Sequence, residues 1–573
     1  MDRKEKHITG ENAADRMTYA GEIFTIGERK AKHDILNTLP KEWKTLHENG
    51  AIHIHDLDAY GNTYNCLAFE IQNAFPYNKV VSMSDNAKII TVFDFMKDFI
   101  MKLGNEQSGG MAFANFDNDL AELFEGLEID KNTIDIDIFK TTMKNFILWC
   151  NDSHERLGKV SYYVSLNIGL ANSDLARLIA DTLLDTFYET EADVFKPNII
   201  FKLNKKVNLK PETHNHALYV KALRTTAKKM IPTYVFTDTK PNSTIEPGDL
   251  VIMGCRTRVV DNKYGNNSSI GRGNITNISI NLPRIALELK ESENLNISTF
   301  LETFRKRATV VANILEDRYQ QLITKREPRD FRLNLAHNLW VRSFQEHSLD
   351  EIFIHGTLSI GYIGLSEAVE IMTGNKPYQN DEAYKDAFSI VEGMRAFVNQ
   401  LKERTRFNYS LLATSGELIS GRFNERDKAK GFNHKTMEKG FYTNSFHVEV
   451  DSGLSSFDKI EHEAPFHALN NGGCITYLEL KEAPINNIEA LHELIEHAYR
   501  NNIHYLGFNF DLDICKHCGN RGIFDACDEC GSQEITRIRR VSGYLEIVDY
   551  FTSGKQQEAK TRTINKVKSC TYQ

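Results

Sequence analysis

The chain of 573 residues has no apolar run close to the roughly 18–20 residues that a membrane-spanning helix needs. Its first residues, MDRKEKHITG, also lack the apolar core of a secretory signal. The nine cysteines are too few for a disulfide framework in so long a chain, and the 12 prolines are too few for a string of linkers. The formal net charge of −9 disfavours binding to polymeric nucleic acid. We therefore expect a cytoplasmic protein that associates with neither membranes nor nucleic acid polymers.

What the chain does contain is an ordinary globular composition, with 41 % apolar and 26 % charged residues. In its middle part, strand-like segments alternate with segments whose apolar residues recur at helical spacing. The expected strands are 162–170, 198–203 and 232–238, and the expected helices are 174–190, capped by Ser173, and about 212–230. This βαβαβ order favours a parallel sheet and an α/β fold.

Longer helices are expected farther along the chain. Thr299 and Glu302 have the spacing of a capping box at the start of a helix that ends near Lys325. Further helices are expected over about 380–404 and 487–501, and the second of these leads into the strand-like segment 505–511. The α/β character therefore extends over most of the chain.

Four of the cysteines lie close together near the C-terminus. Cys515 and Cys518 form one CxxC pair, and Cys527 and Cys530 form a second pair after eight intervening residues. Each pair can bind one face of a tetrahedral ion, and a site closed by four thiolates is structural. The spacing predicts structural zinc, with an iron–sulfur site and a redox dithiol as the alternatives.

A glycine motif, RRVSGYL over 539–545, follows this zinc knuckle. Taken alone, it reads as a turn glycine between two strand-like halves. Directly after a zinc knuckle and near the C-terminus, it resembles the glycyl-radical loop of the glycyl radical enzymes, with Gly543 as the radical residue. A second motif, MGCRTR over 253–258, resembles the active-thiol loop of the anaerobic (class III) ribonucleotide reductases.

Other segments resemble the same reductase family along nearly the whole chain. They are GAIHIHD (50–56), NCL (65–67), GRGN (271–274), INLPRI (280–285), GYIG (361–364), SLLATSGE (410–417), YTNSFH (442–447) and the segment 472–480. His53 and His55 in the first of these are two residues apart, so a strand would point both to one face. We interpret them as hydrogen-bonded structural residues, with a metal pair as the alternative.

The resemblance implies a fold and a domain organisation. The fold is a ten-stranded α/β barrel of two parallel five-stranded halves, with Cys255 at the tip of a loop inside the barrel, facing the Gly543 loop. The catalytic barrel would span 1–505, the zinc knuckle 506–535, and the radical loop with the C-terminal tail 536–573. The resemblance begins near residue 10, so we expect no N-terminal ATP-binding domain.

The resemblance also implies the chemistry. Gly543 would store a radical installed after translation, Cys255 would become the thiyl that takes the 3′ hydrogen of a ribonucleotide, and Cys66 would donate a proton as the 2′ hydroxyl leaves. We expect formate as the reductant, positioned by Asn274 or Asn281. A redoxin is the alternative reductant, and Cys474 would then be a third redox thiol.

Further residues and partners are expected from the same resemblance. Substrate binding is assigned to the small, hydroxylated loop Thr414, Ser415 and Gly416, with a plain helix cap as the alternative, and to Asn444 and Ser445. Cys150 is expected in the core and Cys570 near the tail. The expected partners are a radical S-adenosylmethionine activating enzyme, a second copy of the chain in a homodimer, a ribonucleotide substrate, taken as a triphosphate, and ATP or deoxynucleotide effectors.

Two other functions are carried forward. One is a different glycyl radical enzyme of the formate-lyase type, which the knuckle and the absence of a Cys-Cys pair argue against. The other is a non-catalytic zinc-knuckle binding protein, which would leave the resemblance along the whole chain unexplained.

Overall fold

The computed structural model describes residues 18–80, 82–152 and 161–566. One half of its central barrel consists of five parallel strands in the order in which they occur in the chain. They are β2 (Cys66–Phe69), β3 (Met111–Phe113), β4 (Val164–Ile168), β5 (Asn198–Leu203) and β6 (Thr233–Phe236). The expected strands in this region are thus confirmed, and β5 has the expected bounds.

The other half of the barrel runs in the opposite direction. It contains β9 (Arg272–Asn281), β10 (Thr357–Ile363), β11 (Asn408–Ala413), β12 (Thr476–Glu479) and β13 (Tyr505–Asn509). Strands β9, β10 and β11 are parallel, as are β12 and β13, and the antiparallel pairs β2–β9 and β6–β13 join the two halves. A short strand, β1 (Ile52–Ile54), pairs with β9 outside this path.

The barrel closes where β11 meets the segment that leads into β12. The Gly472 N–H donates to the Leu411 carbonyl at 2.8 Å, and the Ala413 N–H donates to the Gly473 carbonyl at 3.1 Å. Ten strands therefore form a closed wall of two parallel five-stranded halves, which confirms the predicted fold class.

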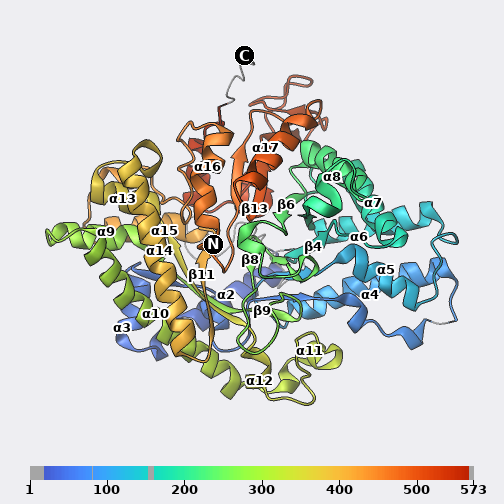
Figure 1. Ribbon diagram of the computed structural model, residues 1–573, viewed down its shortest axis with the longest axis horizontal. Coiled ribbons are helices and arrows are strands. Elements are labelled where there is room, and N and C mark those ends of the chain that lie inside the picture. The colour runs from blue at the N-terminus through green and yellow to red at the C-terminus, as the bar shows by residue number, and fades with distance from the viewer. Residues whose placement is uncertain (1–17, 81, 153–160, 567–573) are drawn as a thin grey trace.

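Helices surround the wall (Figure 1). Over the first half lie α4 (Asp85–Gly104), α5 (Phe116–Gly126), α6 (Ile136–Asp152), α7 (Asp174–Glu189) and α8 (His216–Lys229). The N-terminal helices α2 (Tyr19–Thr38) and α3 (Lys41–Glu48) precede β1, and α3 lies on the side of the second half. Over the second lie α9 (Leu282–Glu291), α10 (Ile297–Lys325), α11 (Arg332–His337), α12 (Leu349–Phe353), α13 (Leu365–Thr373), α14 (Asp381–Arg404), α15 (Leu418–Ala429), α16 (Ser456–His467), α17 (Ile488–Arg500) and α18 (Ser553–Thr561). No helix among the described residues is long and apolar enough to cross a membrane.

The helix starts follow the capping chemistry of the sequence, with one correction. The Ser173 side chain caps α7 by accepting from the Ala176 N–H at 3.1 Å, as predicted. The cap of α10 is Asn296, whose side chain accepts from the Thr299 N–H, so the predicted cap at Thr299 was wrong by three residues. Asparagine caps a helix as well as threonine does, and Thr299 completes the capping box from inside the helix.

A hairpin enters the barrel between its two halves. It consists of β7 (Ile252–Met253) and β8 (Thr257–Arg258), and Cys255 lies at its tip. Met253 and Val251 pack against Ala68, Ala112 and other small residues of the inner wall. Small wall residues leave room for a second layer of chain, so the interior holds this hairpin in place of large side chains.

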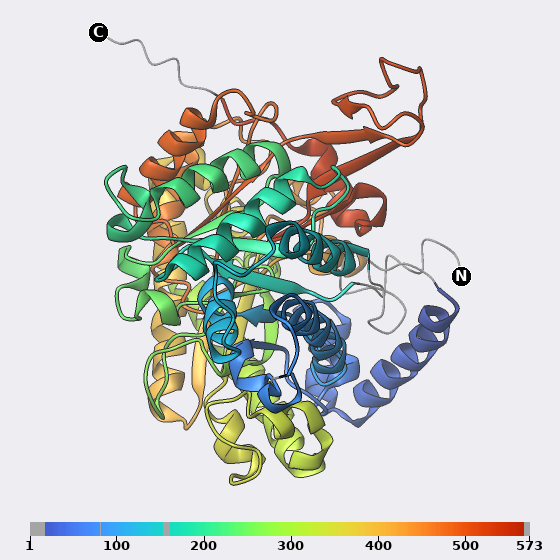
Figure 2. The same cartoon turned by 90° about the vertical axis from the view of Figure 1, so that its right-hand side faces the viewer.

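The C-terminal part forms a separate four-stranded sheet, ordered β15 (Arg521–Gly522), β14 (Leu512–Cys515), β16 (Ile535–Arg540) and β17 (Leu545–Ile547). Figure 2 shows this red arm extending from the body of the protein. Strand β14 ends at Cys515, and its neighbour β16 ends at Arg540, three residues before Gly543. The sheet therefore links the expected knuckle segment to the expected radical loop.

Candidate active site

Gly543 lies directly against the backbone of Cys255. A Cβ atom built on Gly543 would lie 1.9 Å from the Cys255 carbonyl oxygen and 2.3 Å from the Cys255 Cα. Beside this contact, the Cys255 Sγ lies 3.3 Å from the Ser542 hydroxyl oxygen. Only glycine allows this approach, because any side chain would collide with main-chain atoms that cannot move aside.

Buried polar groups fix both ends of the hairpin that carries Gly543. The fully buried Arg540 guanidinium donates to the carbonyls of Phe508 at 3.0 Å, Met230 at 2.6 Å and Gly543 at 3.2 Å. After the hairpin, the buried Glu546 carboxylate pairs with Lys196 at 3.2 Å. These hydrogen bonds and this ion pair are buried, so they hold the loop in place with little competition from water.

The Arg256 guanidinium, next to the thiol, and that of Arg540, next to the glycine, share one aromatic ring. They lie 5.7 Å and 5.9 Å from the centre of the Tyr477 ring, and Arg256 also donates to the Tyr477 hydroxyl at 3.0 Å. Cation–π contacts of this kind strengthen when they are buried. Tyr477 therefore links the thiol loop to the strand that leads into the glycine loop.

Burial raises the pKa of the Cys255 thiol to about 11, and the nearby Glu417 carboxylate adds to the rise. At neutral pH the group is therefore a thiol that carries a hydrogen atom. A thiol that donates a hydrogen atom must keep it, whereas a nucleophilic cysteine needs the thiolate. The environment of Cys255 suits hydrogen-atom transfer better than nucleophilic attack.

This environment predicts slow alkylation of Cys255. The iodoacetamide rate should rise about tenfold for each pH unit up to pH 11, because the reagent attacks the thiolate. The measurement is mass spectrometry of the Cys255 peptide after timed alkylation between pH 7 and pH 11. A rate that levels off near pH 8 would contradict the assigned environment.

Cys255 and Cys66 line the same cavity, which has a volume of about 160 Å³. Cys66 begins β2, its thiol donates to the Asn65 side-chain oxygen at 2.8 Å, and its sulfur accepts from the Gly110 N–H at 3.3 Å. The two thiols are 189 positions apart in the sequence, yet the barrel brings them to one cavity. The lining also includes charged and amide side chains, among them Lys196, Asn277 and Glu417, which could orient a polar molecule beside the two thiols.

The loop expected to hold phosphate lies at this cavity in part. Thr414 and Ser415 line it, together with the first residues of α15. The Gly416 N–H donates to the Asn444 side chain at 2.9 Å, so Asn444 fixes the loop from behind the cavity. Ser445 is fully buried, does not line the cavity, and has a φ of +40°.

The two asparagines considered as reductant-positioning groups lie in different places. Asn274 faces Cys66 across the β2–β9 pair, and its amide donates to Thr357 and Ser359 within the barrel wall. Asn281 caps α9 and donates to the Gly50 carbonyl. Neither residue lines the cavity.

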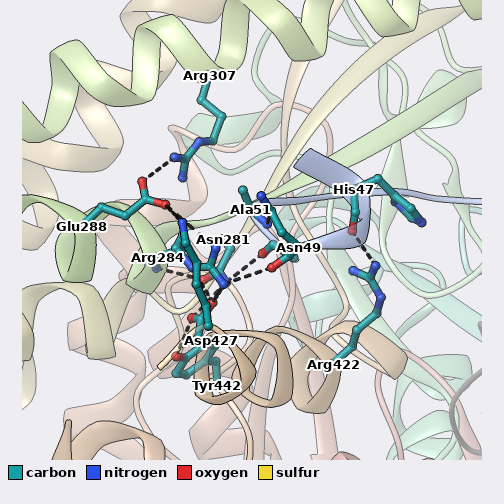
Figure 3. A network of polar contacts seen from close by, with 12 residues as sticks. His47, Asn49, Ala51, Asn281, Arg284, Glu288, Arg307, Arg422, Asp427 and Tyr442 are labelled. Atoms are coloured by element: carbon teal, nitrogen blue, oxygen red, sulfur yellow. Dashed lines mark hydrogen bonds and ion pairs between the residues drawn. The ribbon is translucent and has the colours of Figure 1, made fainter. Parts of the chain in front are cut away.

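Asn281 belongs to a buried ion-pair network (Figure 3). Its amide also donates to the Asp427 carboxylate, which pairs with Arg284 at 2.5 Å and accepts from the Tyr442 hydroxyl at 2.7 Å. Glu288 and the carbonyls of residues 49–50 complete the network. These contacts join β9, α9, α15 and the N-terminal segment, so the structure gives Asn281 an architectural role.

Asn277 and Glu417 lie at the cavity but were not singled out from the sequence, and His55 was expected only as a hydrogen-bonded structural residue. Asn277, on β9, lines the cavity, because a β-bulge opposite Thr357 and Leu358 shifts the alternation of side chains. His55 also lines it and contacts the Ser279 hydroxyl at 2.9 Å, so it lies at the site as well as being hydrogen-bonded. Glu417, the residue before α15, also lines the cavity. The bulge carries no sequence signal, whereas His55 stands in the GAIHIHD segment, where the sequence indicated a structural role but not its position at the cavity.

The remaining thiols lie apart from the cavity. Cys474 is fully buried, its sulfur is directed at the His467 carbonyl at 3.9 Å, and burial raises the pKa of its thiol to about 12. Cys150 is buried in the main core, as expected. Cys570 lies outside the described residues.

The four knuckle cysteines fit a metal ion. Their Sγ atoms all lie within 4.8 Å of one another, and the Cys515–Cys530 and Cys518–Cys527 sulfur pairs are 3.5 Å apart. Tetrahedral Zn–S bonds of about 2.3 Å require sulfur–sulfur distances of roughly 3.8 Å. An ion held there would stiffen the end of β14 and, through the sheet, the strand that leads to Gly543.

Comparisons with known proteins bear on this site. The model of the family described as anaerobic ribonucleoside-triphosphate reductase matches residues 11–564. The chain belongs to this family. It is therefore an oxidoreductase that reduces ribonucleotides, and membership favours this activity over both a formate-lyase-type enzyme and a non-catalytic binding protein.

Among curated relatives, the anaerobic ribonucleoside-triphosphate reductase of Escherichia coli K12 is 29% identical over 567 residues, which cover 91% of this chain and 78% of that protein. The enzyme of the same name from phage T4 is 26% identical over 614 residues, covering 98% and 97%.

Solved structures share the fold at low sequence identity. The anaerobic ribonucleotide reductase of Thermotoga maritima in complex with dATP and CTP has a TM-score of 0.70 at 14% identity, covering 95% of this chain and 92% of that chain. The B12-independent glycerol dehydratase of Clostridium butyricum has a TM-score of 0.59 at 11% identity, covering 94% and 84%. The barrel is therefore shared with an enzyme of different substrate.

Proposed function

We propose that the chain reduces ribonucleoside triphosphates with a radical stored on Gly543 and with formate as the reductant. In the balanced reaction, a ribonucleotide, formate and a proton give a 2′-deoxyribonucleotide, water and carbon dioxide. Formate is oxidised by two electrons, and the C2′–OH bond is replaced by C2′–H. The observation that carries the proposal is the contact between Gly543 and the Cys255 backbone, which only a glycine permits.

Each residue then has one task. The radical on Gly543 supplies the abstraction of the Cys255 thiol hydrogen, which the contact makes effectively intramolecular. Cys255 takes the 3′ hydrogen of the ribose and later returns it. Cys66 donates the proton with which the 2′ hydroxyl leaves as water. The presence of both thiols at one cavity supports this division of roles.

Formate is favoured over a redoxin by the placement of the thiols. A redoxin-dependent cycle needs a third thiol near the two in the cavity, but Cys474 is fully buried and does not line the cavity. Among the residues that line the cavity, Asn277 offers an amide that could position a small carboxylate. We assign to Asn277 the role expected of Asn274 or Asn281.

The substrate phosphates are assigned to the loop Thr414, Ser415 and Gly416 at the start of α15. A helix N-terminus offers unpaired N–H groups and the positive end of the helix dipole, which both favour phosphate. Asn444 holds this loop in place.

The assembly is proposed from the family. Because no group in this chain generates a radical, a radical S-adenosylmethionine activating enzyme is required. We also propose structural zinc on the four cysteines, a homodimer, and nucleotide effectors, since a Thermotoga relative is described with dATP in a specificity site. The catalytic barrel is proposed to span 1–505, with the knuckle (506–535) and the radical segment (536–573) after it.

Labelled formate tests the proposal. We expect activated enzyme supplied with 14C-formate and CTP to release one labelled carbon dioxide for each dCTP formed. The control omits formate and supplies reduced thioredoxin with its reductase. Deoxynucleotide formation in that control, without formate, would overturn the assignment of the reductant.

A further inference from the structure

Glu417 connects the substrate cavity to the glycine loop. It is the residue immediately before α15, it is buried, and it lines the cavity. One carboxylate oxygen accepts from the Ser542 hydroxyl at 2.9 Å, and the other accepts from the Tyr544 hydroxyl at 2.7 Å. Its main-chain carbonyl accepts from the Thr552 hydroxyl at 2.9 Å.

These bonds hold both neighbours of Gly543. Ser542 and Tyr544 are the residues on either side of Gly543, so one carboxylate spans the tip of the hairpin. Hydrogen bonds to an ionised carboxylate are about twice as strong as neutral ones, and burial strengthens them further. The tip cannot leave Cys255 without breaking both bonds.

In the sequence, Glu417 also comes directly after the loop that lines the cavity. Residues 414–416 precede it, and Leu418 and Ile419 after it line the same cavity. A molecule bound against this wall therefore contacts the segment that fixes the carboxylate. The cavity wall and the carboxylate that holds the hairpin tip are therefore parts of one continuous segment.

We propose that Glu417 is a positioning residue that docks the 541–545 hairpin tip onto Cys255 and makes this docking depend on a nucleotide in the cavity. The inference rests on the proposed function, since it takes that cavity as the nucleotide site. An empty cavity leaves the wall looser and lets the hairpin leave for activation. A bound nucleotide holds Gly543 in place for hydrogen transfer.

The docking is tested without any radical. Hydrogen exchange of peptides covering 540–546 is measured by mass spectrometry on the unactivated full chain, with and without CTP. In the wild type, CTP should slow exchange at least fivefold. In Glu417→Gln, which keeps the shape and loses the charge, basal exchange should rise at least tenfold and CTP should have no effect. Equal exchange in the two proteins would overturn the proposal.

A second readout follows activation. In Glu417→Gln, the electron paramagnetic resonance doublet should form at least as fast as in the wild type, while kcat falls about 100-fold and KM for CTP changes less than threefold. Tyr544→Phe and Ser542→Ala each remove one bond and should give intermediate losses. They also serve as the test should Glu417→Gln fail to fold. A variant series with wild-type kcat would contradict the assigned role.

Glu316→Gln is the matched control. Glu316 accepts from the Tyr409 hydroxyl at 2.7 Å, which is the same kind of contact outside the barrel. It should behave as the wild type in both measurements. A wild type that shows no doublet would count against the proposed function, whereas a normal doublet with unchanged variants would count against Glu417 alone.

Discussion

Gly543→Ala should abolish activity, with a loss of at least 10⁴-fold and no organic radical signal. The added methyl group would lie 1.9 Å from the Cys255 carbonyl oxygen, so the hairpin tip would have to move away from the thiol. Alanine also lacks the unsubstituted Cα on which the radical is proposed to form. The measurement is deoxynucleotide formation together with electron paramagnetic resonance after anaerobic incubation with the activating enzyme, S-adenosylmethionine and a reductant.

Gly27→Ala provides the matched control for this loss. Gly27 is an exposed residue in α2, and a methyl group there meets no atom within 4 Å. The substitution should preserve activity and stabilise the helix by up to about 1 kcal/mol. Measurable turnover by Gly543→Ala with normal folding would exclude Gly543 as the radical residue.

Cys255→Ser should give the second large effect, and in a different pattern. The doublet of Gly543 should still form, because the glycine itself is unchanged, but product formation should fall at least 10³-fold. An alcohol O–H bond is much stronger than a thiol S–H bond, so the serine hydroxyl cannot pass the radical on. The measurement compares the doublet intensity with single-turnover dCTP formation in the same sample.

The matched control removes the thiol of Cys474, which does not line the cavity. Cys474→Ala should retain turnover with formate, although the loss of a buried sulfur will lower stability by about 1 kcal/mol. Loss of product in this variant at normal stability would support a redoxin-type third thiol. Normal product formation by Cys255→Ser would remove Cys255 from the proposed path.

Much of the barrel and its two special residues could be predicted from the sequence. The strand 198–203 was predicted with its observed bounds, because a mostly apolar run rich in residues that favour strands, between a helix and a turn, has few alternatives. Gly543 and Cys255 stand in compact motifs whose chemistry depends on one residue each. Their distance in the sequence does not indicate that they touch. The resemblance implied that they face each other, and in the structure their backbones are in contact.

The supporting residues could not be predicted in the same way. Asn277 reaches the cavity through a β-bulge, and a bulge depends on how two strands pair rather than on either strand alone. Glu417 acts on residues more than 120 positions away. The sequence did not distinguish Asn281 from Asn274 as a candidate for positioning the reductant. In the structure Asn281 ends β9, and its side chain contacts the Arg284–Asp427 pair and does not line the cavity.

The contact between Gly543 and Cys255 is made by main chain on both sides, and this has a consequence for how the enzyme can be altered. A step defined by two backbones offers few side chains to adjust, so selection or engineering has little to act on there. The cavity wall, by contrast, is made of side chains from several separate segments. Changes of substrate range should therefore accumulate in the wall, while the radical step is inherited unchanged.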